Sequence, residues 1–577
     1  MNREIGEGKG IALIHPPVVK ACEAPGGLAR LAGALRRHGV ACRVWDASGE
    51  GQLALMESAA QAAGGGEGDA GLPEREGRAE SAPAGPAKRR SGEDSGEVAS
   101  HSGVMPDGHV ALPADSWTRR ATRHREANLA RLRSWELYAN PDRYRRAVAD
   151  LNRLLAVAAK PYGVRLSLAD YEAAELSPVR SADLIRAAAA PEVNPFHPWL
   201  RWRLPEILAE TPVSHVGFSL NYLSQALTAF AMIGLIRREY PHLRIVLGGG
   251  LVTSWMRRPG WRSPFGGLID ELIGGPGEAP LLGLFGKTHD GGCDLPVFDG
   301  FPAAGYLAPG AVLPYSASGG CWWRRCSFCP ERAEGTPYRP IPAGQVVADL
   351  RLLTKRERPA LIHLLDNALS PALLKAVAVR PPGAPWYGFA RITHHLAKRD
   401  FCRQLRDSGC VMLKLGLESG DQGVLDALNK GVDLETAAAV LENLKAVGIA
   451  TYVYLLFGTP AETREAAGRT LEFTAAHADE IGFLNLAVFN LPAYGSDAEG
   501  LDTGEFYEGD LSLYRRFTHP GGWDRGEVRR FLEGQFKRAP AIAAIIRRDP
   551  PFFTSNHAPF LVMAASRGTG GEDGSIG

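Results

Sequence analysis

The sequence predicts an α/β protein made of two parallel sheets: an open, doubly wound domain, then a partial (β/α)6 barrel, and finally a helical C-terminal tail. Three observations support this order. Short apolar runs alternate with helical patterns between residues 305 and 500, glycine-rich turns follow apolar runs before residue 290, and a polar stretch without periodicity interrupts the first part. Repeated strand–helix units form parallel sheets because their crossover connections are right-handed.

The first domain opens with a strand, a helix and a second strand, and it resumes after a long interruption. The runs that indicate strands are residues 10–15, 41–45, 216–220, 245–247 and 268–273. The patterns that indicate helices are residues 27–38 and 225–240. Ser219 stands near the end of one predicted strand, and Gly248, Gly249 and Gly250 follow the next. Glycines at a strand end let a large ligand approach the backbone, and open sheets of this Rossmann-like kind bind ligands beyond their carboxyl ends.

Two segments of unlike composition separate the halves of this domain. Residues 61–116 are rich in Gly, Ala, Glu, Ser, Pro and Arg, with few aromatic residues. Such a segment buries too little apolar surface to offset its ordering entropy, so we expect disorder there. Residues 117–204 contain an Arg- and Ala-rich helical pattern over 121–159, which predicts a helical insertion. The first domain is therefore expected to comprise residues 1–60 and 205–290.

Residues 305–500 are expected to form the barrel, and residues 501–577 the helical tail. The first barrel strand ends near Tyr315, and the other runs that indicate strands are residues 361–365, 386–391, 411–417, 450–456 and 483–490. Helical patterns include residues 434–447 in the barrel and residues 525–538 and 541–548 in the tail. Active sites of such barrels lie at the carboxyl ends of the strands, which is where the loop after the first strand belongs.

This loop contains Cys321, Cys326 and Cys329 with the spacing Cys-x4-Cys-x2-Cys. Clustered thiolates are ligands of iron–sulfur clusters. Three of them would leave one iron of a four-iron cluster open for a substrate or cofactor. A structural zinc site needs a fourth ligand, and no second pair of Cys or His lies near in the sequence. A plant-type two-iron ferredoxin shares this spacing, but its fourth ligand would have to be the distant Cys402.

Several segments after the cysteine loop resemble the strand ends of the radical S-adenosylmethionine (SAM) superfamily. These segments are residues 364–367, 388–391, 416–420, 429–431 and 456–460. Within the loop itself, Phe328 directly before the last cysteine also matches the family. The resemblance implies that Cys321, Cys326 and Cys329 hold a [4Fe–4S] cluster. The residues that it implies for SAM are Phe328, Asp366, Asn367, Arg391, Glu418, Ser419 and Gly458.

The cysteine loop departs from that family in one respect. The usual spacing there is Cys-x3-Cys-x2-Cys, so the first gap of this chain holds one extra residue. Arg324 and Arg325 lie in this gap. They either stabilise an anionic cluster or the SAM carboxylate, or are solvated loop charges, and the sequence favours solvated loop charges.

A doubly wound domain ahead of such a core resembles the cobalamin-binding domain of the cobalamin-dependent radical SAM enzymes. On this resemblance, Ser219, Gly248, Gly249 and Gly250 line the nucleotide tail of the corrinoid. The Asp-x-His-x-x-Gly motif of other cobalamin-binding domains is absent, since residues 16–20 read Pro-Pro-Val-Val-Lys. We therefore expect no histidine of this loop to coordinate cobalt. The alternative is a degenerate domain that only shapes the substrate channel.

The resemblance implies reductive cleavage of SAM to a 5′-deoxyadenosyl radical, and it favours cobalamin-dependent methylation of an unactivated carbon. Radical cyclisation, rearrangement or oxidation without methyl transfer is the first alternative. A non-catalytic iron–sulfur protein for electron transfer or regulation is the second, and the nearly complete set of strand-end motifs argues against it. A ferredoxin or flavodoxin is the expected low-potential electron donor. The sequence does not identify the substrate.

Charge and hydropathy agree with a soluble enzyme. The 577 residues include 65 Lys and Arg against 64 Asp and Glu, a formal net charge of +1, so no overall field attracts nucleic acid. The most apolar helical pattern, residues 226–236, is too short to span a bilayer. No targeting peptide opens the chain. We therefore expect a cytoplasmic protein of several domains, with neither a membrane nor a nucleic acid as partner.

Overall fold

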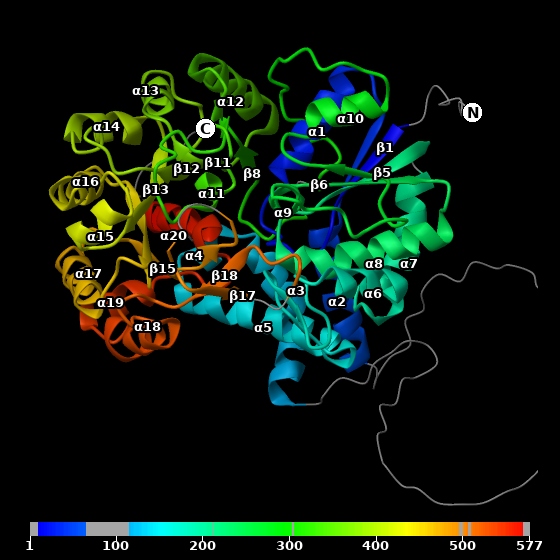
Figure 1. The fold of residues 1–577 in the computed structure, drawn as a ribbon, viewed down its shortest axis with the longest axis horizontal. Coiled ribbons are helices and arrows are strands. Elements are labelled where there is room, and N and C mark those ends of the chain that lie inside the picture. The colour runs from blue at the N-terminus through cyan, green and yellow to red at the C-terminus, as the bar shows by residue number, and fades with distance from the viewer. Residues whose placement is uncertain are drawn as a thin grey trace, which may run out of the picture.

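Two parallel sheets lie side by side in two lobes of the protein (Figure 1). The computed structural model describes residues 10–64, 115–209, 212–302, 305–494, 500–505 and 509–568. No helix in these ranges is long and apolar enough to cross a membrane. The α/β class and the order of the two sheets confirm the prediction.

The first sheet has five parallel strands in the order β2-β1-β5-β6-β7. Its strands are β1 (Gly10–His15), β2 (Cys42–Asp46), β5 (Val213–Ser219), β6 (Arg244–Gly248) and β7 (Glu271–Ile273). The strand order reverses between β1 and β5, so a ligand crevice is expected at their carboxyl ends. The last strand is shorter than the predicted run of residues 268–273.

Helices cover both faces of this sheet, as in a doubly wound fold. One apolar layer joins Ile11 and Val246 of the sheet to Leu28 of α1 (Gly26–Arg37) and Leu281 of α10 (Glu278–Leu284). The other joins Phe218 to the fully apolar side of α8 (Leu223–Glu239). Parallel sheets need both covers because both faces of their strands are apolar.

The insertion between β2 and β5 packs on the second of these layers. It contains α3 (Ser116–Leu132), α4 (Trp135–Tyr138), α5 (Pro141–Ala159), the hairpin β3 (Val164–Leu166) and β4 (Tyr171–Ala173), α6 (Ser181–Ala189) and α7 (His197–Ala209). One further helix was not predicted. It is α2 (Ala47–Gly64), which takes up the first four residues of the segment expected to be disordered. Of the segment 61–116 that was expected to be disordered, residues 65–114 lie outside the described residues.

The second sheet is a six-stranded, fully parallel partial barrel in the order β15-β14-β13-β12-β11-β8. Its strands are β8 (Val312–Tyr315), β11 (Leu361–Leu369), β12 (Trp386–Ala390), β13 (Cys410–Glu418), β14 (Ala450–Phe457) and β15 (Phe483–Val488). The helices that link them are α12 (Ala343–Glu357), α13 (Pro371–Val379), α14 (Arg399–Asp407), α15 (Gln422–Ala427), α16 (Leu434–Ala446) and α17 (Arg464–Ala476). These helices bury the outer face of the barrel in one continuous apolar layer.

The C-terminal region is mostly helical, as predicted, but it also contains strands. Its helices are α18 (Arg525–Phe531), α19 (Pro540–Ile546) and α20 (Thr554–Gly568). A small antiparallel sheet joins β16 (Leu491–Pro492), β18 (Tyr514–Phe517) and β17 (Thr503–Glu505). The helical character of the tail is confirmed, whereas the strands were not predicted, because strands of two to four residues are too short to show a period in the sequence.

Helix α20 lies against the inner face of the barrel. It contacts β13, β14 and α4, and Figure 1 shows it in red between the barrel strands and α4. Phe553, Ala558 and Phe560 are fully buried in the apolar cluster that also contains Tyr387 and Met412 of the barrel. The C-terminal segment thus closes the interior of the barrel from the side opposite its outer helices.

Candidate active site

The cysteine loop starts directly after β8, at the carboxyl ends of the barrel strands. Cys326 is buried and its two companions are half-buried. Arg391, at the end of β12, donates to Cys326 Sγ at 3.7 Å, and both Cys326 and Cys321 act electrostatically on this guanidinium. Burial raises the pKa of Cys329 to about 11, and the neighbouring thiols Cys326 and Cys321 add to this shift. The three thiols therefore lie close enough to one another and to Arg391 to interact electrostatically.

The residues present fit an iron–sulfur cluster. Within the described ranges, no three His, Cys, Asp or Glu side chains converge as the compact ligand set of a single metal ion. Three soft thiols in one loop suit a cluster that has several iron atoms, with one iron left for another ligand. Cys402, the fourth ligand in the ferredoxin alternative, is buried in the outer layer, where its thiol donates to the Leu396 carbonyl at 3.0 Å.

Two tryptophans fasten the first half of the loop to the barrel. Trp322 Nε1 donates to the Leu369 carbonyl at 3.2 Å, and Trp323 Nε1 donates to the Asn429 carbonyl at 3.1 Å. The Arg391 guanidinium lies 4.2 Å from the centre of the Trp323 ring. The longer first gap contains a left-handed turn at Arg324, with φ of 53°.

Glu418 and Lys430 form a buried ion pair at the end of β13. Their oxygen and nitrogen are 2.6 Å apart, and only 12% and 7% of their side chains are exposed. A Cβ at Gly416 would lie 2.5 Å from the Glu418 carboxylate and 2.8 Å from Lys430 Nζ, so glycine leaves the space for this pair. Lys430 also lies 5.5 Å from the centre of the Phe328 ring. The pair thus connects β13 to the last cysteine.

The other predicted SAM residues divide into two groups. Asn367 donates to Glu331, two residues beyond Cys329, at 3.0 Å, and so faces the loop. The Asp366 carboxylate is occupied instead, because it accepts from the Ala317 N–H at 2.9 Å and from the Ser318 hydroxyl at 2.5 Å. This side chain anchors the start of the cysteine loop.

Ser419 and Gly458 face the outer helices. The Ser419 hydroxyl is fully buried and bonds to Thr470 of α17 at 3.1 Å, so this side chain holds the strand end on its helix. Gly458 has a φ of 79° and donates its N–H to Glu462. Glu462 also accepts from Trp523 Nε1 at 2.9 Å, and burial raises its pKa to about 7. Sequence reasoning included Lys430 only as part of the segment 429–431. It did not predict the pairing of Lys430 with Glu418, the bond from Trp323 to Asn429 or the Glu462–Trp523 bond, because such contacts carry no signal in the sequence.

A cavity of about 950 Å³ opens between the first sheet and the cysteine loop. Ser219, Gly248, Gly249 and Gly250 line it from the carboxyl ends of β5 and β6. The opposite wall includes Gly319, Gly320, Glu331 and Pro337 of the cysteine loop. The four residues predicted to contact a ligand therefore lie together, and their cavity borders the predicted cluster.

Backbone geometry requires the glycine at position 249. Its φ is 111°, and a Cβ there would lie 2.3 Å from the Leu220 carbonyl oxygen. This close approach of β5 and the turn after β6 lowers the rim of the cavity.

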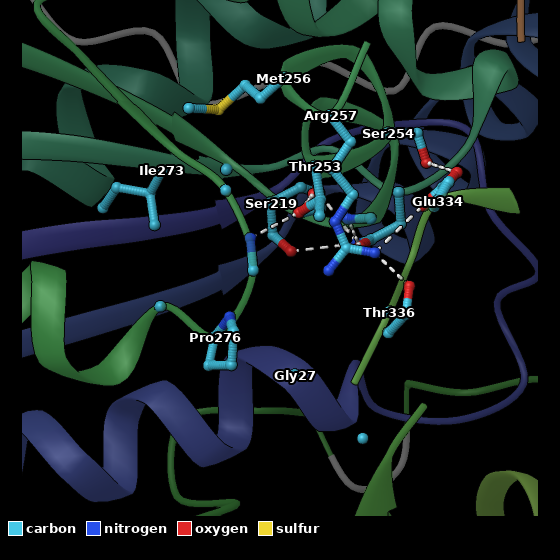
Figure 2. A pocket seen from close by; sticks show the side chains of 18 of the residues that line it. Gly27, Ser219, Thr253, Ser254, Met256, Arg257, Ile273, Pro276, Glu334 and Thr336 are labelled. Carbon is cyan, nitrogen blue, oxygen red and sulfur yellow. Dashed lines mark hydrogen bonds and ion pairs between the residues drawn. The ribbon is translucent and has the colours of Figure 1, made fainter. Parts of the chain in front are cut away.

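Polar side chains of α9 (Gly250–Met256) and the residue after it connect the cavity rim to the cysteine loop. Ser254 donates to Glu334 at 2.6 Å, and Arg257 donates to Thr336 and to Glu334 (Figure 2). Burial raises the pKa of Glu334, although Ser254 and Arg257 oppose the shift. Two lobes that are far apart in sequence thus share one wall of the cavity.

Residues 315–474, which contain the cysteine loop and most of the barrel, match the model of the radical SAM superfamily. This segment is a radical SAM domain. Such a domain works with a [4Fe–4S] cluster and SAM, which agrees with the three thiols at the strand ends.

Two curated proteins resemble parts of the chain. The anaerobic magnesium-protoporphyrin IX monomethyl ester cyclase of Rubrivivax gelatinosus is 23% identical over 247 residues, which are 37% of this chain and 44% of the relative. An uncharacterized methyltransferase of Pyrococcus horikoshii is 23% identical over 189 residues, which are 31% of this chain and 40% of the relative. The chain therefore spans less than half the length of the curated relatives that it matches.

Solved structures of two radical SAM enzymes are also similar. The methyltransferase TsrM from Kitasatospora setae, with cobalamin and a [4Fe–4S] cluster bound, has a TM-score of 0.41 and 18% identity, over 58% of this chain and 78% of TsrM. The cobalamin-dependent enzyme OxsB has a TM-score of 0.37 and 16% identity, over 52% of this chain and 48% of OxsB.

Proposed function

We propose that the protein is a radical SAM enzyme that methylates an unactivated carbon, with cobalamin held in the 950 Å³ cavity. The observation that supports this most is the position of the cavity. One wall is the glycine-rich crevice of a doubly wound sheet, and the other is the loop that carries the three cysteines. A second large cofactor there would face the cluster and SAM across a short distance.

The side chains around the cysteine loop have separate tasks in this proposal. Cys321, Cys326 and Cys329 would hold the cluster, while Asn367, Arg391 and Glu418 border the site of SAM. When bound, the cluster and SAM would supply the radical chemistry that removes hydrogen from an unactivated carbon. The protein binds and orients the reactants, and it excludes water from this radical.

The cavity suits a corrinoid in two respects. Its volume lies at the upper end of the range for ligand pockets. Ser219 and the three glycines present backbone and a small hydroxyl, which let a bulky ligand approach. We propose that no histidine of the loop after β1 coordinates cobalt, because residues 16–20 lack the Asp-x-His-x-x-Gly motif.

The electron donor would meet the protein at the cysteine loop. Arg324 and Arg325 are exposed there, and within the described chain neither forms an ion pair, although Arg325 stacks on Trp323 at 5.1 Å. Two free guanidinium groups beside the cluster complement an acidic carrier such as a flavodoxin or ferredoxin. We place the reaction in the cytoplasm, where all eight cysteines would stay free, as they are in the structure.

Anaerobic reconstitution with iron and sulfide, followed by SAM and dithionite, tests the catalytic class. We expect 5′-deoxyadenosine from the wild type and from Cys293→Ala, whose thiol is exposed and is not one of the three loop cysteines, but none from Cys326→Ala. An intact cluster without SAM cleavage would instead support an electron-transfer protein.

Cobalamin binding is tested separately, by the corrinoid absorbance of protein incubated with hydroxocobalamin and desalted. Retention of about one corrinoid per chain is expected. If SAM is cleaved but no corrinoid is retained, methyl transfer is excluded and radical cyclisation, rearrangement or oxidation takes its place.

A further inference from the structure

A hydrogen-bonded chain of three ionisable side chains lies inside the barrel. His363 of β11 bonds through Nδ1 to the Glu23 carboxylate at 2.9 Å, and Lys414 of β13 bonds through Nζ to His363 Nε2 at 3.1 Å. A lysine ammonium can only donate, so Nε2 accepts and the imidazole proton belongs on Nδ1. The two partners therefore fix one neutral tautomer of His363.

The hydrogen-bonded series Glu23–His363–Lys414 joins three parts of the protein that are far apart in sequence. Glu23 belongs to the loop after β1 of the first sheet, and its carboxylate also accepts from Asn556 of α20 at 3.1 Å. His363 and Lys414 are each only 5% exposed, whereas 14% of the Glu23 side chain is exposed. Lys414 is the buried end of this hydrogen-bonded series, and Glu23 is the end that lies at the boundary between the lobes.

Aromatic rings hold Lys414 and His363 in position. Tyr387 stacks on the His363 ring with centroids 4.4 Å apart and an interplanar angle of 10°. Lys414 Nζ lies 4.5 Å from the centre of the Phe389 ring and 5.2 Å from that of Tyr387. These two rings attract the ammonium group through cation–π interactions and limit its movement.

The hydrogen bonds of Lys414 are incomplete. It has three N–H donors, and His363 is its one acceptor among the residues that the structure describes. Burial lowers the pKa of Lys414 to about 8 against the opposing effect of Glu23, so the amine is still protonated at pH 7. A buried cation with unfilled donors is costly, and such sites are normally completed by a partner.

The position of Lys414 suits a partner that enters from the cluster side. Lys414 and Gly416 point to the same face of β13, because side chains alternate along a strand. The space at Gly416 is bordered by the Glu418–Lys430 pair, which lies beside the cysteine loop. Phe389, Gly416 and Tyr454 are all partly exposed, so the residues around Lys414 on the inner face of the barrel are accessible from outside the protein.

We propose that Lys414 binds the substrate inside the barrel by donating hydrogen bonds to a carboxylate or carbonyl oxygen, while His363 and Glu23 hold its ammonium group in place. This inference rests on the proposed function, because it names the class of substrate that the radical chemistry would act on: an organic molecule with an acceptor oxygen near the reacting carbon. The competing interpretation is a purely structural charge pair, which would bind no ligand.

Bromide is a suitable probe, because it accepts hydrogen bonds and is located by anomalous scattering. We expect crystals of the full-length protein soaked in sodium bromide to show a peak within hydrogen-bonding distance of Lys414 Nζ. The peak should vanish in Lys414→Met, weaken at least twofold in His363→Gln, and persist in Lys375→Met, which alters an exposed lysine of α13. Bromide at other basic groups but none at Lys414 in the wild type would overturn the proposal, and this outcome needs no variant to fold.

The same wild-type preparation is assayed for 5′-deoxyadenosine with SAM and dithionite. SAM cleavage without bromide at Lys414 would contradict only the substrate inference. Bromide at Lys414 without SAM cleavage would contradict the proposed function and, with it, the assignment of the bound group as a substrate.

Discussion

Ser254 in α9 donates a 2.6 Å hydrogen bond to Glu334, five residues beyond the last cysteine of the loop. Tyr494 adds a second contact from the end of the barrel, because its hydroxyl donates to the Ser254 carbonyl at 2.5 Å. The wall of the cavity is therefore a polar contact between the two lobes. Its strength decides how firmly the crevice of the first sheet faces the cysteine loop.

Glu334→Ala should loosen this contact. The substitution leaves the Ser254 hydroxyl without its acceptor, and a lost buried hydrogen bond costs about 1–3 kcal/mol of unfolding free energy. Denaturant unfolding checks this loss, and hydrogen exchange should accelerate in residues 250–257 and 330–337. Glu472→Ala, on the exposed side of α17, is the matched control and should change neither measurement. Unchanged exchange in both segments would mean that the lobes are held together elsewhere.

Gly27→Leu should lower cobalamin uptake and leave the fold intact. Gly27 lines the cavity near the start of α1, and a Cβ there meets no atom within 4 Å. Leucine also favours a helix over glycine by about 0.5–1 kcal/mol, so unfolding should not become easier. Gly468→Leu controls for the added side chain, because Gly468 also lies in a helix with open surroundings but away from the cavity. Equal corrinoid absorbance in both variants and the wild type would place the cofactor elsewhere.

Glu462→Gln should stabilise the protein increasingly as the pH rises from 5 to 8. Burial raises the pKa of Glu462 to about 7, so the folded protein binds a proton more tightly than the unfolded chain. Stability from this group is complete below the ordinary pKa of 4.5 and is lost as the pH rises toward 7. A shift of this size corresponds to roughly 3 kcal/mol at most.

Urea unfolding at the two pH values measures the effect, with Glu465→Gln as a control of opposite sign. The pKa of Glu465 is lowered by hydrogen bonds from its own backbone N–H and from Thr463, so removing this charge should cost stability at higher pH. A constant difference between Glu462→Gln and the wild type at pH 5 and 8 would contradict the prediction.

The double substitution Arg324→Glu and Arg325→Glu should slow SAM cleavage driven by reduced flavodoxin by about tenfold or more at low salt. Reversing both charges turns attraction of an acidic carrier into repulsion. Cleavage driven by dithionite should change little, and the defect should shrink at about 0.5 M salt as the charges are screened. Arg380→Glu, on the exposed end of α13, serves as the control. An equal loss with both reductants would show that the arginines act on the cluster itself.

The sequence predicted the periodic parts of the fold and not the contacts between them. All six barrel strands were found, because each is an apolar run between helical patterns. Ser219 and the triple glycine were also found, since a strand followed by glycines is a local pattern. Helix α20 lies in the tail that was predicted to be helical, but its position against the inner face of the barrel was not predicted, because that contact has no signal in the sequence.

The candidate site shows the same division. The cysteines are adjacent in sequence and so are visible there, but Glu23, His363 and Lys414 come from three separate segments. Asp366 and Ser419 carried the right spacing for SAM, yet their side chains are occupied by Ser318 and Thr470. Whether a strand-end polar group faces a ligand or a neighbouring loop depends on rotation about one side chain, which sequence spacing does not encode.

The contact between α4 and α20 also affects how the protein forms. Tyr138 and His557 share a buried hydrogen bond of 3.1 Å across 419 positions of the chain. Contacts of such long range close late, because the entropy of the intervening chain must be lost first. During synthesis the cysteine loop is therefore complete well before α20 seals the barrel. Until α20 has been synthesised, the barrel strands therefore lack the helix that covers their inner face.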